Sequence, residues 1–153
     1  MPILHFATTI NAPPQAVFDC LADFAHYDHW LPPSDMYKSV MQVSDNPVKL
    51  GSTYVDKGTN STMHGSVTVY QPPQKITFHQ VTQIKLLMVK LAGLEVTIAY
   101  QLTADGAGTN VERDVTVQAS GLLALLQSRL LTGITAESQR ILAALKVGLE
   151  KSA

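Results

Sequence analysis

The chain has 153 residues, of which 46% are hydrophobic and 15% charged, and its formal net charge is −1. This length and composition are typical of a single globular domain, which we place at residues 1–153. The basic residues are scattered singly, so the concentrated basic surface that nucleic-acid binding requires is missing and we expect no nucleic-acid partner.

The N-terminal part predicts a strand followed by two short helices. Residues 2–10 have the pattern of a strand. Residues 11–14 (Asn-Ala-Pro-Pro) suit a helix start, because a proline in the first turn costs no hydrogen bond. Apolar residues at helical spacing predict a helix to about residue 22. A second helical segment over residues 24–30 is stopped by two prolines.

The middle of the chain predicts an antiparallel meander, because its apolar runs are separated by short turns. Residues 94–102 alternate between apolar and polar side chains, as a half-buried strand does. In the last strand, Arg113 alternates with valines and therefore shares their face. The expected strands cover residues 37–44, 52–57, 64–70, 75–82, 94–102 and 111–117.

Residues 121–153 predict one long helix with an apolar stripe. The stripe is interrupted in the middle, where Glu137 and Ser138 stand in place of the next apolar residue. A helix that covers a sheet and carries polar groups in the middle of its apolar face indicates a cavity beneath it. The stripe consists of Leu123, Leu126, Leu130, Ile134, Ile141, Leu145 and Leu149.

Five segments, taken in this order, carry a family resemblance. They are residues 10–18 (INAPPQAVF), 21–30, 51–54 (GSTY), 108–111 (GTNV) and the closing helical segment 138–150. This chain resembles the START-like (helix-grip, or SRPBCC) superfamily, and within it the polyketide cyclase/dehydrase-like families. Each motif is weak alone, but their order and spacing cover nearly the whole chain.

The resemblance implies an α+β fold: a curved antiparallel sheet of about seven strands wrapped around a long C-terminal helix, with two short helices after the first strand. It also implies a deep, mostly apolar cavity between sheet and helix. Members bind lipids, sterols, polyketides or other hydrophobic molecules, and some catalyse cyclisation or dehydration. A fold of this kind does not by itself define a reaction.

Three functions follow as hypotheses. The first is binding of a small hydrophobic molecule, whether lipid-, polyketide- or aromatic-like, in that cavity. The second is a cyclase or dehydratase acting on a carbonyl substrate in the same cavity, although no convincing acid/base pair emerges from the sequence. The third is a protein-interaction module that uses the apolar residues 86–94 and has no sizeable internal cavity.

Arg113 is the first candidate site residue, because its strand position predicts that it faces the cavity. A buried guanidinium stays charged and needs a partner. Glu137 on the closing helix is one candidate, and an acidic group of the ligand is another. An outward-facing Arg113 is the alternative.

Tyr100 lies on the apolar face of its strand, so its hydroxyl needs a partner. A ligand carbonyl and a backbone carbonyl are the two alternatives, and the second is commoner in proteins. Ser138 is a further orienting group, and the facing of Tyr54 and Asp56 is ambiguous. The full set of cavity candidates is Arg113, Tyr100, Ser138, Glu137, Ile98, Val96, Val115, Phe78, Ile134 and Tyr54.

The histidines give little support to a metal or a catalytic site. His26 and His29 have a ligand-like spacing, but no third ligand group follows them. His64 and His79 are expected to face outward, opposite the apolar residues of their strands. Motifs for serine nucleophiles, phosphate loops and dinucleotides are absent, so we expect neither metal nor cofactor.

Residues 84–94 are more apolar than a surface connection usually is. Buried strand ends are the simplest interpretation for Leu86, Met88 and Leu91. A lip of the pocket, a membrane-touching rim or a dimer surface are the alternatives. With one cysteine, no signal-like N-terminus and no apolar run long enough to span a bilayer, we expect a cytoplasmic protein without stable membrane insertion. A homodimer is a further expectation.

Overall fold

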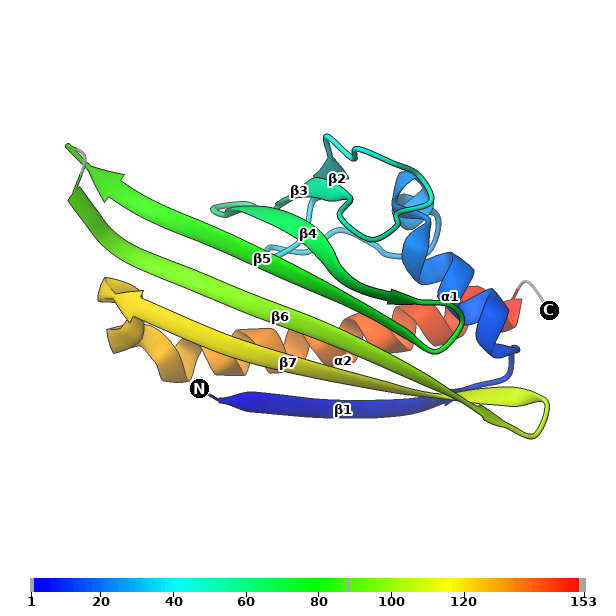
Figure 1. The fold of residues 1–153 in the computed structure, drawn as a ribbon. Coiled ribbons are helices and arrows are strands. Elements are labelled where there is room, and N and C mark those ends of the chain that lie inside the picture. Colours follow the sequence, from blue (N-terminus) through cyan, green and yellow to red (C-terminus); the bar gives the residue numbers. More distant parts are fainter. Residues whose placement is uncertain (1, 88, 152–153) are drawn as a thin grey trace.

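In the computed structural model, which describes residues 2–87 and 89–151, seven antiparallel strands form one curved sheet around a long C-terminal helix (Figure 1). The strand order is β1-β7-β6-β5-β4-β3-β2, so the first strand joins the last one at one side of the sheet. The predicted helix-grip fold is therefore confirmed. The strands are β1 Ile3–Ile10, β2 Ser39–Met41, β3 Thr53–Lys57, β4 Thr62–Gln71, β5 Lys75–Leu86, β6 Val89–Asp105 and β7 Gly108–Gly121.

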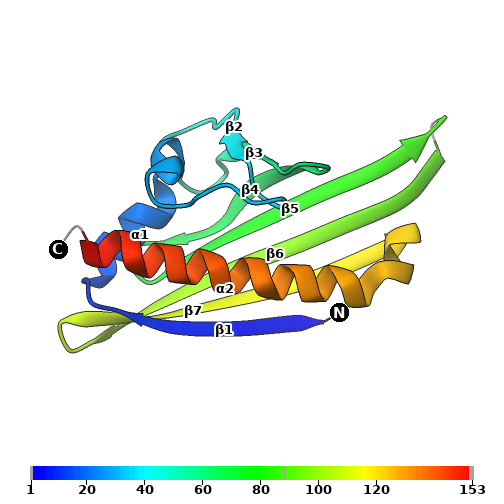
Figure 2. The same ribbon diagram turned by 180° about the vertical axis from the view of Figure 1, so that it is seen from behind.

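The two predicted short helices follow β1. Helix α1 (Pro14–Ala22) has proline in its first turn, and the 3-10 helix η1 (Phe24–His29) follows after one residue. Helix α1 buries Val17, Phe18 and Leu21. It lies near the C-terminal end of the long helix, where it closes one end of the space between helix and sheet (Figure 2).

The long helix begins later than the sequence predicts. A short 3-10 helix, η2 (Leu122–Leu126), precedes α2 (Gln127–Lys151), because Gly121 has a positive φ of 60° that turns the chain before the helix starts. The expected burial of Leu126 is wrong, since this side chain is 48% exposed. The buried residues of α2 are Ile134, Ser138, Leu142 and Leu145.

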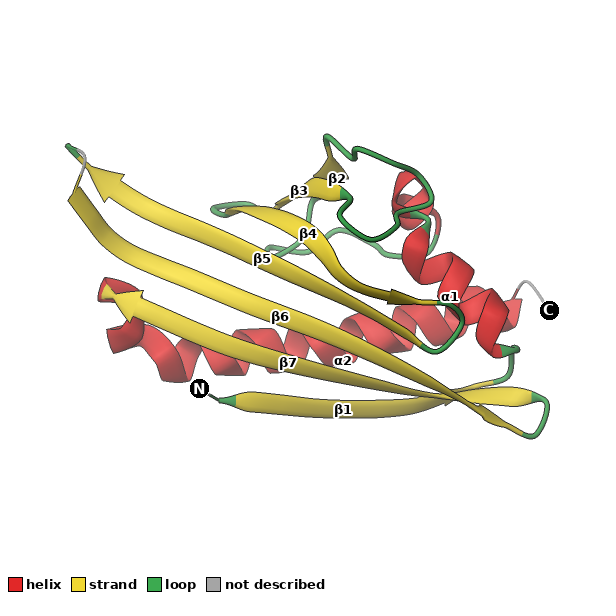
Figure 3. Cartoon of the chain, in the orientation of Figure 1, coloured by secondary structure: helices red, strands yellow, loops and turns green. Residues whose placement is uncertain are grey.

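The middle strands differ in length from the prediction. Only Ser39–Met41 of the expected strand 37–44 pairs with a neighbour, whereas β5 and β6 form a long hairpin that runs past the end of β4 (Figure 3). An irregularity in the pairing between Val67 and Val69 interrupts β4 and adds curvature to the sheet. The sheet therefore bends around α2 and leaves room on its concave side.

The solid core occupies only one part of that concave side. Phe18 and Leu21 of α1 pack with Leu142 and Leu145 in the C-terminal half of α2, and Val111 of β7 lies in the same cluster. All five side chains are at least 96% buried. Under the N-terminal half of α2 a smaller cluster packs Ile134 against Val96, Val115 and Val117, and the cavity lies beside it.

Gly133 in α2 has room for a larger side chain, which gives a test of how the helix packs at this position. A Cβ atom there would meet only the Met36 Sδ atom, at 3.7 Å, an ordinary contact. Gly133→Ala is therefore expected to raise the free energy of unfolding by about 0.5–1 kcal/mol, since glycine lowers helix stability by that amount. Urea denaturation measures the gain. Gly148→Ala is the control: its new carbon would lie 2.9 Å from Trp30 Cβ, so an equal gain there would contradict this packing.

Candidate functional site

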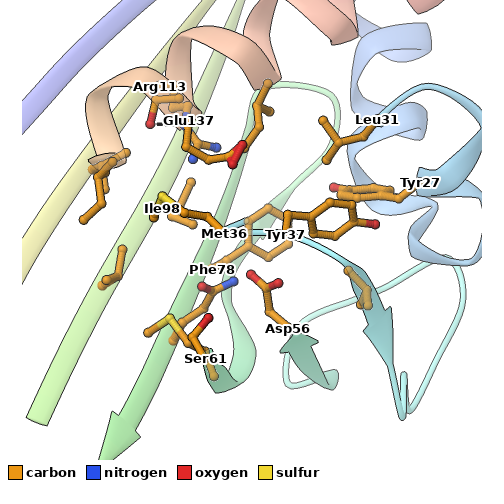
Figure 4. Close-up of a pocket in the computed structure, with 18 of the residues that line it drawn as sticks. Tyr27, Leu31, Met36, Tyr37, Asp56, Ser61, Phe78, Ile98, Arg113 and Glu137 are labelled. Carbon is orange, nitrogen blue, oxygen red and sulfur yellow. Dashed lines mark hydrogen bonds between the residues drawn. The ribbon is translucent and has the colours of Figure 1, made fainter. Parts of the chain in front are cut away.

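A cavity of about 360 Å³ lies between the concave face of the sheet and the N-terminal half of α2 (Figure 4). Its wall is mostly apolar and strongly aromatic. Seven of the ten aromatic residues of the chain line it: Phe24, Tyr27, Trp30, Tyr37, Tyr54, Phe78 and Tyr100. Several of these rings meet edge to face, as Phe24 and Tyr54 do with centroids 4.8 Å apart.

All the cavity candidates taken from the sequence lie in the wall of this cavity. They come from strands β3, β5, β6 and β7 and from helix α2. The ten residues are Arg113, Tyr100, Ser138, Glu137, Ile98, Val96, Val115, Phe78, Ile134 and Tyr54.

Arg113 faces inward from β7, as its alternation with valines predicts, and is only 5% exposed. Its Nε atom donates to Ser138 Oγ at 3.2 Å, and its Nη1 atom donates to the hydroxyl of Tyr100, its neighbour across the β6–β7 pair. The guanidinium carbon also lies 5.3 Å from the centre of the Tyr100 ring. Arg113 is thus held in one orientation by neutral groups.

Glu137 is not the ionic partner of Arg113, which corrects one expectation from the sequence. Its Oε1 atom lies 2.5 Å from Arg140 Nε, one turn further along α2, and its Oε2 atom accepts from Ser34 Oγ at 2.6 Å. The nearer cation on the same helix takes the carboxylate. Among the described residues, no Asp or Glu forms an ion pair with Arg113.

The Tyr100 hydroxyl accepts a hydrogen bond from Arg113, and among the described residues it has no backbone carbonyl as the expected commoner partner. A phenolic hydroxyl that accepts one bond keeps its own proton for another acceptor. Arg113 and Tyr100 together therefore present donors to the cavity.

Tyr54 and Asp56, whose facing the sequence leaves open, both line the cavity from β3. The Tyr54 hydroxyl accepts from Gln80 Nε2 at 2.9 Å, and burial raises the pKa of this tyrosine. Burial also raises the pKa of Asp56 to about 6, with Glu137 adding to the rise. The Gln80 amide and the charge of Arg113 partly offset it.

Two side-chain polar atoms in the described part of the chain are buried without a hydrogen-bond partner, Asp56 Oδ1 and Trp30 Nε1. Both belong to residues of the cavity wall. Trp30 directly follows η1, at the C-terminal cap of this short helix. The alternation of Tyr54 and Asp56 is the sequence signal that points to Asp56. The alternation of β5 places Gln80 on the face of Ile76 and Phe78, while nothing in the sequence pattern identifies Trp30 as a cavity residue.

The histidines lie away from the cavity. His64 is exposed on the outer face of the sheet, and His79 Nε2 lies 2.6 Å from Glu95 Oε1. His26 Nδ1 lies 2.8 Å from the Asp23 carboxylate on the surface. Within residues 2–87 and 89–151, no three His, Cys, Asp or Glu side chains are grouped closely enough to hold a metal ion.

The apolar segment 84–94 forms the end of the β5–β6 hairpin. Leu91 is half-buried, as expected for a strand end, whereas Met88 and the side chain of Leu86 lie outside what the structure describes. Leu87 and Val89 are exposed, as are Leu122 and Leu125 of η2. The interaction-module hypothesis expects no sizeable internal cavity, and the 360 Å³ cavity contradicts it on this point.

The described helices do not include one that is both long and apolar enough to cross a lipid bilayer. The arrangement as a whole, a curved sheet closed by a C-terminal helix over an aromatic cavity, defines a helix-grip protein.

Sequence comparison gives the family. Residues 1–150 match the family described as polyketide cyclase / dehydrase and lipid transport, and the chain belongs to it. No curated protein sequence matches this chain.

Solved structures share the fold over nearly the whole chain. Protein MLL2253 from Mesorhizobium loti has a TM-score of 0.74 and 14% identity, with 99% of each chain covered. Ara h 8.0201 has a TM-score of 0.72 and 14% identity, with 98% of each chain covered. The Aha1 dimer from Colwellia psychrerythraea has a TM-score of 0.61 and 15% identity, covering 97% of this chain and 98% of its own. At these identities the likeness concerns the fold.

Proposed function

We propose that this protein binds a small, largely apolar molecule that carries an electron-rich oxygen, with its apolar body in the cavity and the oxygen at Arg113. The observation that carries the proposal is a buried guanidinium in an apolar cavity wall, without an ion pair to any described carboxylate. A guanidinium remains charged at physiological pH and is costly to bury without a counter-charge. An oxygen of the occupant supplies that charge.

The size and lining of the cavity support this proposal. Pockets for small molecules commonly measure about 300–1,000 Å³ and combine apolar walls with a few fixed polar groups. Here the aromatic wall removes apolar ligand surface from water, which drives binding, while Arg113 and Tyr100 orient the ligand. A carbonyl, carboxylate or phenolate oxygen accepts from such donors.

Native mass spectrometry of the purified protein, followed by extraction under denaturing conditions, is the direct test. Release of a defined small molecule with an acidic or carbonyl group is the expected result. A purely hydrocarbon-like molecule in stoichiometric amount would contradict the role of Arg113.

Arg113→Met is expected to reduce the affinity for 2-naphthoic acid about tenfold more than the affinity for 2-methylnaphthalene, because only the acid has a charge-assisted hydrogen bond to lose. Isothermal titration calorimetry with both probes measures the ratio. Arg129→Met is the matched control, since Arg129 is exposed on the same helix and does not line the cavity. An unchanged ratio in Arg113→Met would overturn the proposal.

A cyclase or dehydratase is the second candidate function. The paired donors of Arg113 and Tyr100 favour it, because such donors stabilise the negative charge that develops on a carbonyl oxygen during enolisation. Exchange of the α-hydrogens of 2-acetylnaphthalene in D₂O, followed by NMR, tests this chemistry. Acceleration by the protein that disappears in Arg113→Met supports the enzyme, and exchange at the buffer rate contradicts it for this substrate class.

The homodimer and the cytoplasmic location both stay predictions. The dimeric Aha1 structure shares the fold, and the exposed side chains of Leu87, Val89, Leu122 and Leu125 are apolar surface that a second copy would cover. Sedimentation of the purified protein measures the oligomeric state directly.

A further inference from the structure

The cavity has a second polar position, separate from Arg113. Asp56 lies in its wall on β3, and its Oδ1 atom is buried without a hydrogen-bond partner. In Figure 4 the labelled Asp56 side chain lies on the side away from α2, whereas Arg113 and Glu137 lie next to that helix. The cavity therefore offers donors on one side and a free acceptor on the other.

Asp56 stands out from the other two acidic residues of the wall, Asp35 and Glu137, because Asp35 is exposed to solvent. The Glu137 carboxylate is satisfied by Arg140 and Ser34. The Gln80 amide donates to the Tyr54 hydroxyl and also interacts with the Asp56 carboxyl group, but Asp56 Oδ1 is left without a partner. Buried polar atoms in folded proteins nearly always have partners, so an unpartnered one in a cavity wall points to a group supplied by the occupant.

The second unpartnered atom, Trp30 Nε1, belongs to the same cavity wall. It is a donor, whereas Asp56 Oδ1 is an acceptor. A hydroxyl group can serve either atom, since it both donates and accepts. Both unpartnered side-chain atoms that the structure describes thus belong to the cavity wall, where a ligand would lie. A second polar group of the ligand, in addition to the one at Arg113, would satisfy them.

We propose that Asp56 selects hydroxylated ligands: the occupant is an aromatic acid or ketone that also bears a hydroxyl group, and this hydroxyl donates to Asp56 Oδ1 while the acidic or carbonyl oxygen lies at Arg113. The aromatic class follows from the seven aromatic residues in the wall. The inference rests on the proposed function, because it needs a ligand in the cavity.

The probes are 2-naphthoic acid and its 6-hydroxy and 7-hydroxy derivatives, compared by isothermal titration calorimetry near neutral pH. At least one hydroxy derivative is expected to bind about tenfold more tightly than the parent acid, the usual size of a hydrogen bond to a charged group. The 3-hydroxy derivative is the chemical control, since its hydroxyl already bonds to the neighbouring carboxylate and gains nothing.

Asp56→Leu is expected to bring the ratio of the two affinities close to one. Leucine has a similar size and no acceptor, and removing an unpaired buried acceptor favours folding, so the variant is expected to fold; its thermal unfolding checks this. Glu95→Gln removes one negative charge on the outer face, where Glu95 binds His79, and keeps the ratio of the native protein.

The outcomes separate the inference from the proposed function. If the parent acid binds through Arg113 but no hydroxy derivative gains affinity, or the gain persists in Asp56→Leu, the role of Asp56 is overturned and the proposed function stands. If none of the acids binds the native protein, the proposed function fails for aromatic acids and the inference fails with it.

Discussion

Asp56→Asn is expected to raise the free energy of unfolding by about 2–3 kcal/mol at pH 8 and to change it little at pH 4. The reason is that burial raises the pKa of this carboxyl group from 3.8 to about 6. The native protein therefore carries an unfavourable charge at neutral pH, which asparagine removes at nearly constant shape. Urea denaturation of both proteins at the two pH values measures the difference.

The sign follows from proton binding. Below pH 3.8 the carboxyl group is protonated in both the folded and the unfolded chain, and it has no effect. Between that pH and about 6 the unfolded chain has lost the proton while the folded protein still holds it, so stability falls as pH rises. Above this pH range the carboxyl group is ionised in both states, and the free-energy cost of the buried charge stays at its maximum. The Gln80 amide and the charge of Arg113 reduce this penalty, and Glu137 increases it.

Asp45→Asn is the matched control, because its carboxylate has the opposite environment. The Ser52 and Ser44 hydroxyls donate to Asp45 Oδ2 at 2.9 and 3.0 Å, and these bonds lower its pKa. The asparagine variant is expected to lose stability at neutral pH. If Asp56→Asn behaves like Asp45→Asn, with a loss rather than a gain at pH 8, the Asp56 carboxyl group is not desolvated.

Gly65→Ala is expected to lower the free energy of unfolding by about 2 kcal/mol, within the usual range for overpacking a core. A Cβ atom at this position of β4 would lie 2.2 Å from Cζ of Tyr54, its partner on β3. Phe24 packs against the same ring, with centroids 4.8 Å apart, and Gln80 binds its hydroxyl. The displaced ring has to enter the cavity, so probe binding is expected to weaken as well.

A double-mutant cycle identifies the collision. In a Tyr54→Leu background the new methyl group meets no ring, so Gly65→Ala is expected to cost much less there than in the native protein. Equal costs in the two backgrounds would place the strain in the backbone of β4 instead. Gly133→Ala, for which a gain in stability is expected, is the control for the added methyl group itself.

The sequence predicts the architecture well because hydrophobic periodicity reports which face of an element is buried. The alternation around Arg113 and Tyr100 places both side chains in the cavity wall, and both lie there. Element ends are less well predicted. The extension of β7 to Gly121 and the 3-10 turn after it depend on the φ of 60° at Gly121, which places the chain against Leu91 of β6.

The hydrogen-bond and ion-pair partners inside the cavity are harder to predict from the sequence than the direction in which each side chain faces. Glu137 is a reasonable partner for Arg113 by sequence, but Arg140 lies one helical turn away and takes the carboxylate. Trp30 follows η1 and reaches the wall only in the folded chain, where segments distant in the sequence come together around the cavity. The sequence shows that Asp56 shares one face of its strand with Tyr54, but only the folded structure shows that this face points into the cavity.

Trp30, the single tryptophan of the chain, stands in the cavity wall with its indole N–H unpartnered. Tryptophan fluorescence of this protein therefore comes from a single site in the cavity wall, next to the position of a bound ligand. The fluorescence of Trp30 therefore reports whether the cavity is occupied. Filling the cavity changes the polarity around the indole, and a hydrogen-bond acceptor that reaches Nε1 shifts the emission spectrum further. Ligand collections can thus be screened on the native chain, without a label or a displaceable dye.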